Sequence, residues 1–171
     1  WELISLANKH PRVNILQPGC GVGGHCIAVD PYFIVSDYPK ESKIILQARE
    51  INNYKALWCI EKIINKIHHY KELNNAKPKI ALLGLSFKAN IDDLRESPAK
   101  YIATELYKKY ENELINVVEP NIKKHSDFNI VSLDYALNNS DLFFVLVGHD
   151  EFTGIKKLIG NKELFSFVMN R

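Results

Sequence analysis

The chain has little cysteine, little methionine and almost no net charge. Its 171 residues include three Cys and one Met, and 22 Lys and Arg oppose 20 Asp and Glu. Three thiols are too few for a disulfide scaffold, and their spacing matches no zinc motif. The basic residues are scattered along the chain, so the composition argues against a nucleic-acid partner.

Long apolar runs and targeting signals are missing as well. No stretch reaches the roughly 18 to 20 apolar residues of a membrane span, and the N-terminus lacks the layout of a signal peptide. We therefore expect a cytoplasmic protein. Residues 1–8 (WELISLAN) have apolar side chains at helical spacing but no initiator Met. We expect the chain to begin inside a helix, as a fragment of a longer polypeptide.

The second half of the chain alternates short apolar runs with helical patterns. The expected strands are residues 79–85, 114–118, 142–147 and 164–169, and the expected helices are 97–110, 133–139 and 151–159. Continuous apolar strands between helices predict a parallel sheet covered on both faces. We therefore predict a Rossmann-like α/β domain over residues 79–171.

The segment after the first expected strand, GLSFKANIDDLRESP, lies where such sheets bind ligands, at the carboxyl ends of the strands. Lys88 and Arg95 are cations that could reach an anionic group, and Ser97-Pro98 can begin a helix whose N-terminus attracts phosphate. Gly84 stands alone, with neither G-x-G-x-x-G nor a Walker loop in the chain. This domain is therefore not expected to bind a dinucleotide in the usual way.

A long amphipathic helix is predicted before this domain. From about residue 42 to 73, apolar side chains recur mostly at steps of three and four. Its length of roughly 45 Å exceeds what a small domain needs. A strut or a dimerisation element is the natural interpretation.

Residues 18–26, PGCGVGGHC, contain four glycines and end on a cysteine. Glycines let the backbone approach a ligand closely, and a helix beginning near Gly24 would activate the thiol of Cys26. Asp30, one turn later on that helix, could orient water or assist proton transfer. Cys20 adds a second thiol that could oxidise against Cys26. The alternative is a packed thiol, which is the common state of a free cysteine.

Three stretches, PGCGVGGHCIAVDPYFIV, GLSFKANIDDLRESPA and VVEPNI, resemble the UDP-glucose/GDP-mannose dehydrogenase family over the whole chain. The His before the cysteine and the Asp-Pro after Val are most similar to members that oxidise UDP-N-acetylmannosamine. The resemblance implies that residues 1–73 end a central helical domain, with the catalytic loop and the long helix. It implies that residues 79–171 form the UDP-sugar-binding domain.

The activity that the resemblance implies is an NAD-dependent, four-electron oxidation of the sugar C6 alcohol to a carboxylate. Cys26 matches the nucleophile, which passes through a thiohemiacetal and a thioester, and Asp30 matches a carboxylate near it. Arg95 matches an arginine that reaches NAD, which a domain absent from this chain mainly binds. The implied substrate contacts are Ile15, Leu16, Gly19, Gly21, Gly23, Gly24, Phe87, Lys88 and Arg171.

Further expectations follow from the resemblance together with the residue patterns described above. They are a homodimer formed through the long helix, a role in making precursors of surface polysaccharide, no metal, and no turnover by this chain alone. Two alternatives stay open. The chain could be a non-catalytic remnant that binds UDP-sugar or dimerises, or part of a dehydrogenase for UDP-N-acetylglucosamine or UDP-glucose.

Overall fold

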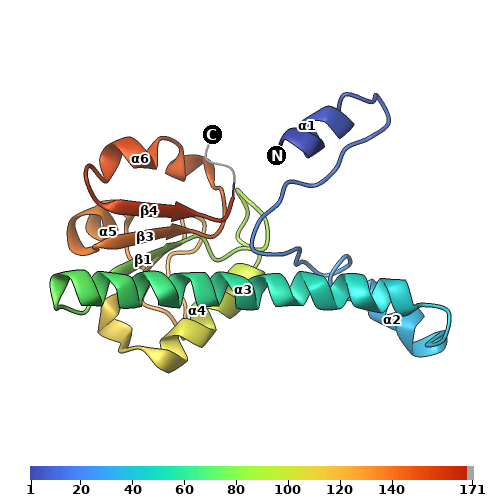
Figure 1. Cartoon of the computed structure of the whole chain (residues 1–171), viewed down its shortest axis with the longest axis horizontal. Coiled ribbons are helices and arrows are strands. Elements are labelled where there is room, and N and C mark those ends of the chain that lie inside the picture. Colours follow the sequence, from blue (N-terminus) through green and yellow to red (C-terminus); the bar gives the residue numbers. More distant parts are fainter. Residues whose placement is uncertain (169–171) are drawn as a thin grey trace.

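The computed structural model describes residues 1–168, with helices placed before and around a small sheet (Figure 1). The strands are β1 (Ile80–Leu83), β2 (Ile115–Val118), β3 (Leu142–Val145) and β4 (Glu163–Ser166). The α-helices are α1 (Glu2–Ala7), α2 (Asp30–Asp37), α3 (Lys43–Asn74), α4 (Pro98–Lys109), α5 (Leu133–Asn139) and α6 (Ile155–Leu158). Short 3₁₀ helices cover Asn112–Leu114 and Asp150–Phe152.

The four strands form one parallel sheet in the order β2-β1-β3-β4. In register, Leu83 at the end of β1 lies between Val118 of β2 and Val145 of β3. The chain therefore runs outward from β1 to β2 and then returns to place β3 on the other side of β1. This is the switch in strand order that marks the ligand edge of doubly wound folds. The predicted Rossmann-like α/β fold is confirmed.

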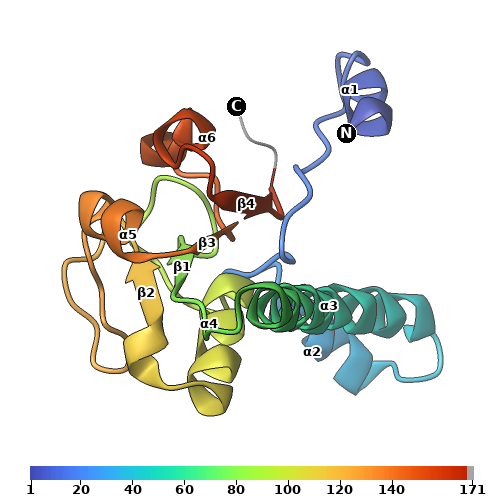
Figure 2. The ribbon, with the colours of Figure 1, turned by 60° about the vertical axis from the view of Figure 1, so that its left-hand side comes forward.

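Helices cover both faces of the sheet (Figure 2). Alternate strand residues point to opposite faces. Ile80 and Leu82 join a core with α3 and α4, whereas Ala81 and Leu83 join a core with α5 and α6. Because both faces are buried, every residue of the three strands β1, β2 and β3 is buried. This burial explains why β1 and β3 read as unbroken apolar runs. In β2 the buried Asn116 interrupts the run, and its side chain donates to the Ser140 hydroxyl at 2.9 Å.

The helix α3 is 32 residues long, about 48 Å at ~1.5 Å per residue. It ends at Asn75, whose φ of 49° provides the left-handed cap common at helix ends. Its second half packs on α4 and the sheet, and its first half lies beside α2 (Figure 1). The helix predicted over residues 42–73 is confirmed. No helix within residues 1–168 is long and apolar enough to cross a membrane.

The helix predicted over residues 151–159 is wrong as a single element. The structure has a 3₁₀ turn followed by α6, and Gly154 between them has a φ of +75°. A residue in this left-handed conformation interrupts a right-handed helix, and glycine adopts it without strain. The interruption turns the chain before it enters β4.

Candidate functional site

The glycine loop, residues 19–24, packs against the segment that follows β1. A Cβ at Gly23 would lie 2.2 Å from the carbonyl oxygen of Glu96 and 2.9 Å from Pro98 Cδ. A Cβ at Gly24 would lie 3.0 Å from the ring of Phe87, and the Gly24 amide donates to the Arg95 carbonyl at 3.1 Å. These glycines are therefore required by the protein's own packing. Their loop covers the start of α4, which the sequence offered as a phosphate site.

Cys26 is exposed two residues beyond this loop. The helix expected near Gly24 is wrong, because α2 begins at Asp30 and Cys26 lies in the turn before it. The Cys26 carbonyl accepts hydrogen bonds from the amides of Val29 (3.0 Å) and Asp30 (2.8 Å). Asp30 is the exposed first residue of α2, and its backbone bond to Cys26, four residues earlier, closes one helical turn between the two residues.

Arg95 and Asp93 form a forked ion pair beside residues 26–29, the turn that carries Cys26 and is called the thiol turn below. The Arg95 guanidinium donates to Asp93 through Nε at 2.9 Å and a terminal nitrogen at 2.6 Å. These bonds hold the pKa of Asp93 at about 2, with His25 adding a small effect in the same direction. Hydrogen bonding to Asp93 raises the pKa of Arg95, and the Cys26 thiol raises it slightly further. Both effects place the residues around the thiol within electrostatic reach of this pair.

Phe87 and Lys88 lie on the loop between β1 and α4. The Phe87 amide donates to the Asp93 carbonyl at 3.1 Å, which folds this loop back on itself. Phe87 is half-buried under Gly24, and Lys88 is exposed. The loop ends at Ser97, the N-cap of α4, whose hydroxyl donates to the Leu85 carbonyl at 2.6 Å and accepts from an α4 amide.

Cys20 does not face Cys26. It is buried, donates to the carbonyl of Leu146 at 3.5 Å, and lies next to Cys59 of α3. A hydrogen bond with Cys59 and burial raise the pKa of Cys20, and the same hydrogen bond lowers the pKa of Cys59. Oxidation of Cys20 against Cys26 is therefore not favoured by this arrangement, and Cys59 is a core residue.

The remaining predicted contacts are spread more widely. Ile15 and Leu16 are exposed on the extended segment after α1, where the Ile15 backbone bonds to the Asn8 side chain. Gly19 lies near Val168, which a Cβ at this position would meet at 3.5 Å. Arg171 lies outside the described residues. The structure therefore gathers Gly21, Gly23, Gly24, Phe87 and Arg95 around the thiol turn and leaves Ile15 and Leu16 on the N-terminal segment.

Some contributors to the site were not predicted from the sequence. Asn52 of α3 binds the loop backbone at Val22 from both sides, accepting from its amide at 2.7 Å and donating to its carbonyl at 3.1 Å. Glu119 and His149 bind the backbone of the loop after β1: the Glu119 carboxylate accepts the Leu85 amide, and the His149 ring accepts the Asn90 amide. The two side chains also contact each other. Glu119 is the acidic residue of the motif VVEPNI, and its place in that motif was the one sequence feature that could have pointed to it.

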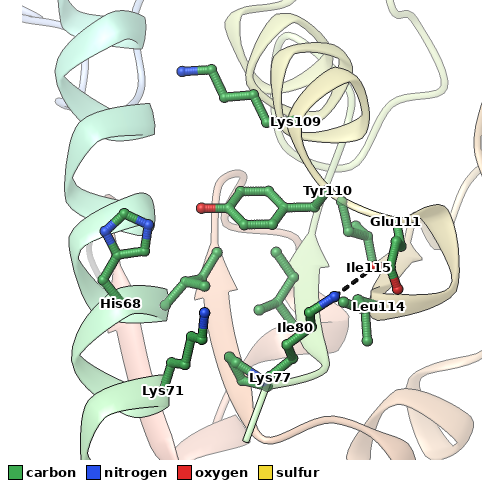
Figure 3. Close-up of a pocket in the computed structure, with 11 residues that line it drawn as sticks. His68, Lys71, Lys77, Ile80, Lys109, Tyr110, Glu111, Leu114 and Ile115 are labelled. Atoms are coloured by element: carbon green, nitrogen blue, oxygen red, sulfur yellow. Dashed lines mark hydrogen bonds and ion pairs between the residues drawn. The ribbon is translucent and has the colours of Figure 1, made fainter.

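Two hollows lie at opposite ends of the strands. A shallow one of about 480 Å³ is lined by Asp93, Arg95 and Lys100, at the thiol end. The other, of about 280 Å³, lies below the first residues of β1 and β2, where His68 and Lys71 of α3 flank the hollow that the Tyr110 ring reaches into (Figure 3). Only the first of these lies at the ligand edge of the sheet.

Comparison with known proteins decides the family. Residues 81–167 match the UDP-binding domain of the UDP-glucose/GDP-mannose dehydrogenase family, and residues 1–54 match its central domain. This chain belongs to that family. The first match alone covers just over half of the 171 residues.

Individual relatives agree with this assignment. The chain is 52% identical over 163 residues to a UDP-N-acetyl-D-mannosamine dehydrogenase of Campylobacter jejuni, covering 91% of this chain and 39% of the relative. It is 47% identical over 156 residues to an NDP-N-acetyl-D-galactosaminuronic acid dehydrogenase of Ralstonia solanacearum, covering 89% of this chain and 36% of the relative. The chain thus spans about two fifths of the length of these dehydrogenases.

Solved structures show the same fold. The structure of a UDP-D-ManNAc dehydrogenase from Pyrococcus horikoshii matches with a TM-score of 0.78 and 30% identity, over 99% of this chain and 40% of that one. A UDP-N-acetyl-mannosamine dehydrogenase from S. aureus matches with a TM-score of 0.72 and 33% identity, over 97% of this chain and 39% of that one.

Proposed function

We propose that this chain supplies the sugar-nucleotide and thiol portion of an NAD-dependent UDP-N-acetylmannosamine 6-dehydrogenase. The observation that carries the proposal is the exposed Cys26, presented beside Phe87 and Arg95 by a loop that packs on the UDP-binding domain. The identities to UDP-N-acetyl-D-mannosamine dehydrogenases support it. Residues 1–73 then belong to the central domain, and residues 79–171 form the UDP-sugar domain.

The chemistry proposed for Cys26 is covalent capture of the aldehyde formed from the C6 alcohol. The thiolate adds to the aldehyde carbon and gives a thiohemiacetal, which is oxidised to a thioester. Water then attacks the thioester, releasing the carboxylate and restoring the thiol. Asp30 is proposed to orient this water, because its carboxylate stands at the start of α2, joined to Cys26 by a backbone hydrogen bond.

Binding of the UDP-sugar is assigned to two segments that meet at the thiol turn. The loop from Ile15 to Gly24 would border the nucleotide sugar, and Phe87 and Lys88 would contact it from the α/β side. Arg171 is retained as a proposed substrate contact.

The cofactor is proposed to be NAD, which when bound supplies the electron acceptor for both oxidations. Arg95 suits a contact with its pyrophosphate, because the guanidinium is exposed and lies beside the thiol turn. The loop after β1 holds only Gly84 where a dinucleotide fold has its fingerprint. We therefore propose that a further domain binds most of the NAD and that this chain alone does not turn over.

Two properties of the whole enzyme complete the proposal. Homodimerisation is placed on the first half of α3, where Ile44, Ile51, Tyr54 and Leu57 are exposed at one to two helical turns' spacing. A monomeric mass of the full polypeptide by light scattering would contradict it. The enzyme is proposed to work in the cytoplasm, on precursors of surface polysaccharide.

The test uses the polypeptide purified from its source cells, with its intact mass measured first. It is then supplied with NAD and, separately, UDP-N-acetylmannosamine, UDP-N-acetylglucosamine and UDP-glucose. We expect two NADH per molecule of UDP-N-acetylmannosamine and a uronate product, both abolished by Cys26→Ser. Full activity of the Cys26→Ser variant would remove Cys26 from the mechanism, and faster oxidation of another sugar would reassign the substrate. Steady NADH formation by the 171-residue chain alone would contradict the proposed need for another domain.

A further inference from the structure

Three strand ends meet around a buried Glu–His pair beneath the Phe87–Lys88 segment. Glu119 directly follows β2, and His149 lies four residues beyond β3. Ser86 lies three residues beyond β1 and contacts the same pair. These three residues are at most 3% exposed. None of them is among the residues to which we assigned catalysis, substrate or cofactor.

The Glu119 carboxylate is surrounded by hydrogen-bond donors. One oxygen, Oε2, accepts from the amides of Leu85 at 2.7 Å and Ser86 at 3.1 Å, and lies 3.2 Å from His149 Nε2. The other oxygen accepts from the Asn121 amide at 3.1 Å. Burial alone would raise the pKa of Glu119, but the bonds from His149 and the amides outweigh burial and lower it. The carboxylate is therefore ionised at neutral pH.

The hydrogen bonds fix the tautomer of His149. Its Nδ1 accepts the amide hydrogen of Asn90 at 3.0 Å, so the ring proton is on Nε2. Nε2 faces the Glu119 carboxylate at 3.2 Å and therefore donates to it. The side chain of Asn90 in turn accepts the amide of Asp150 at 2.9 Å. The His149 ring thus joins Asn90, in the middle of the loop after β1, to the carboxylate that holds the amides at the start of that loop.

These bonds fix the backbone on both sides of Phe87 and Lys88. The amides of residues 85 and 86 are held before the pair, and the amide of Asn90 is held after it. Between them, the Ser86 hydroxyl donates to the Lys88 carbonyl at 2.7 Å. The ring of Phe87 is in turn the surface on which Gly24 packs, two residues before Cys26.

We propose that Glu119 and His149 are positioning residues of the sugar-nucleotide site, which hold Phe87 and Lys88 toward the substrate and seat the loop that carries Cys26. This inference rests on the proposed function. It gives the VVEPNI motif a physical role, because the acidic residue after β2 binds the amides of the loop after β1. In this fold those amides are thereby unavailable to a pyrophosphate.

The experiment compares Glu119→Gln with wild type in the full-length polypeptide that contains this chain. A glutamine amide keeps the shape but presents an NH₂ group to donors, so at least one hydrogen bond is lost. We expect the KM for the UDP-sugar to rise at least tenfold, while the KM for NAD stays within twofold. The matched control is Glu151→Gln, which makes the same charge change on an exposed residue near His149 and should leave both values unchanged.

Each outcome is decisive. A wild-type enzyme that forms no NADH would overturn the proposed function and this inference with it. An active wild type with an unchanged KM for the sugar in a folded Glu119→Gln variant would overturn this inference alone, as would an equal rise in both KM values. Where Glu119→Gln fails to fold by circular dichroism, His149→Gln decides, since it removes the ring nitrogen that accepts the Asn90 amide and spares the bonds from the loop amides to Glu119. We expect a rise of several-fold in the sugar KM, and no rise would refute the role.

Discussion

Gly23→Ala should release the glycine loop from the α/β domain. The new Cβ would lie 2.2 Å from the Glu96 carbonyl oxygen, 0.8 Å inside the 3.0 Å that Cβ atoms keep from other heavy atoms. The nearest obstacle is backbone, which cannot rotate away as the end of a side chain can. Overpacking of this kind costs about 2 to 3 kcal/mol. Opening of the loop should therefore become roughly 30- to 150-fold more frequent, at about 1.4 kcal/mol per factor of ten.

The assay is the rate at which Cys20 is alkylated, followed by peptide mass spectrometry. Cys20 is 4% exposed within this loop, so it reacts only when the loop opens, whereas the exposed Cys26 provides an internal reference. The control is Gly19→Ala, whose Cβ would make an ordinary 3.5 Å contact with Val168. If Cys20 reacts no faster in Gly23→Ala than in Gly19→Ala, the loop is not held by the contact described.

Three further predictions concern the capping serines, the ion pair and the nucleotide. Ser97→Ala should cost about 2 kcal/mol in urea unfolding, because it removes the cap of α4 and the hydroxyl bonded to the Leu85 carbonyl. Ser132→Ala, which removes only a cap, should cost about 1 kcal/mol or less; equal costs would contradict the second bond. In Arg95→Ala, NMR titration should find the pKa of Asp93 raised from about 2 toward 3.8. Because the folded pKa is the lower one, the pair stabilises the fold above the ordinary carboxyl pKa and loses this effect as pH falls toward 2; a pKa still near 2 in the variant would contradict the assignment. UDP should raise the melting temperature, since a ligand that binds only the folded state stabilises it, and no shift at millimolar UDP would count against the nucleotide site.

The sheet was predictable because of where its strands lie. Leu82 of β1 and Phe143 of β3 are fully buried, so apolar side chains occupy both faces of these strands and each appears as a continuous run. The long helix was predictable because apolar residues recur at steps of three and four along all of it, whether they are buried against the α/β core, like Ile60 and Ile63, or exposed, like Ile51. In both cases the pattern of apolar residues is local, so it can be recognised within one short stretch of sequence.

The thiol loop was only partly predictable. Its glycines indicated that something comes close to the backbone, but not that this would be Phe87, Glu96 and Pro98 of the same chain. That contact joins segments more than 60 residues apart, and no local pattern encodes it. For the same reason the sequence suggested a helix at Gly24, whereas packing keeps residues 24–29 out of the helix.

The buried Glu–His pair was beyond local analysis altogether. Glu119 and His149 are 30 residues apart and meet because β2 and β3 lie on either side of β1 and run parallel to it, so their ends share one edge of the sheet. Recognising the pair requires the strand order, which follows from packing of the whole domain.

Because α3 is one continuous helix, the number of residues between its contact with the glycine loop and its contact with the α/β core fixes how these two parts are placed. Asn52 of this helix hydrogen-bonds to the backbone of the glycine loop. About two to four turns later, Ile60, Ile63 and Ile67 pack in the α/β core. One residue inserted between the two contacts would turn them by about 100° and separate them by ~1.5 Å more. Substitutions along this stretch can be absorbed singly, but an insertion or deletion would swing the thiol away from the sheet. Relatives that keep this contact between the glycine loop and the α/β domain should therefore conserve the number of residues between these two anchor points, even where the residues themselves differ.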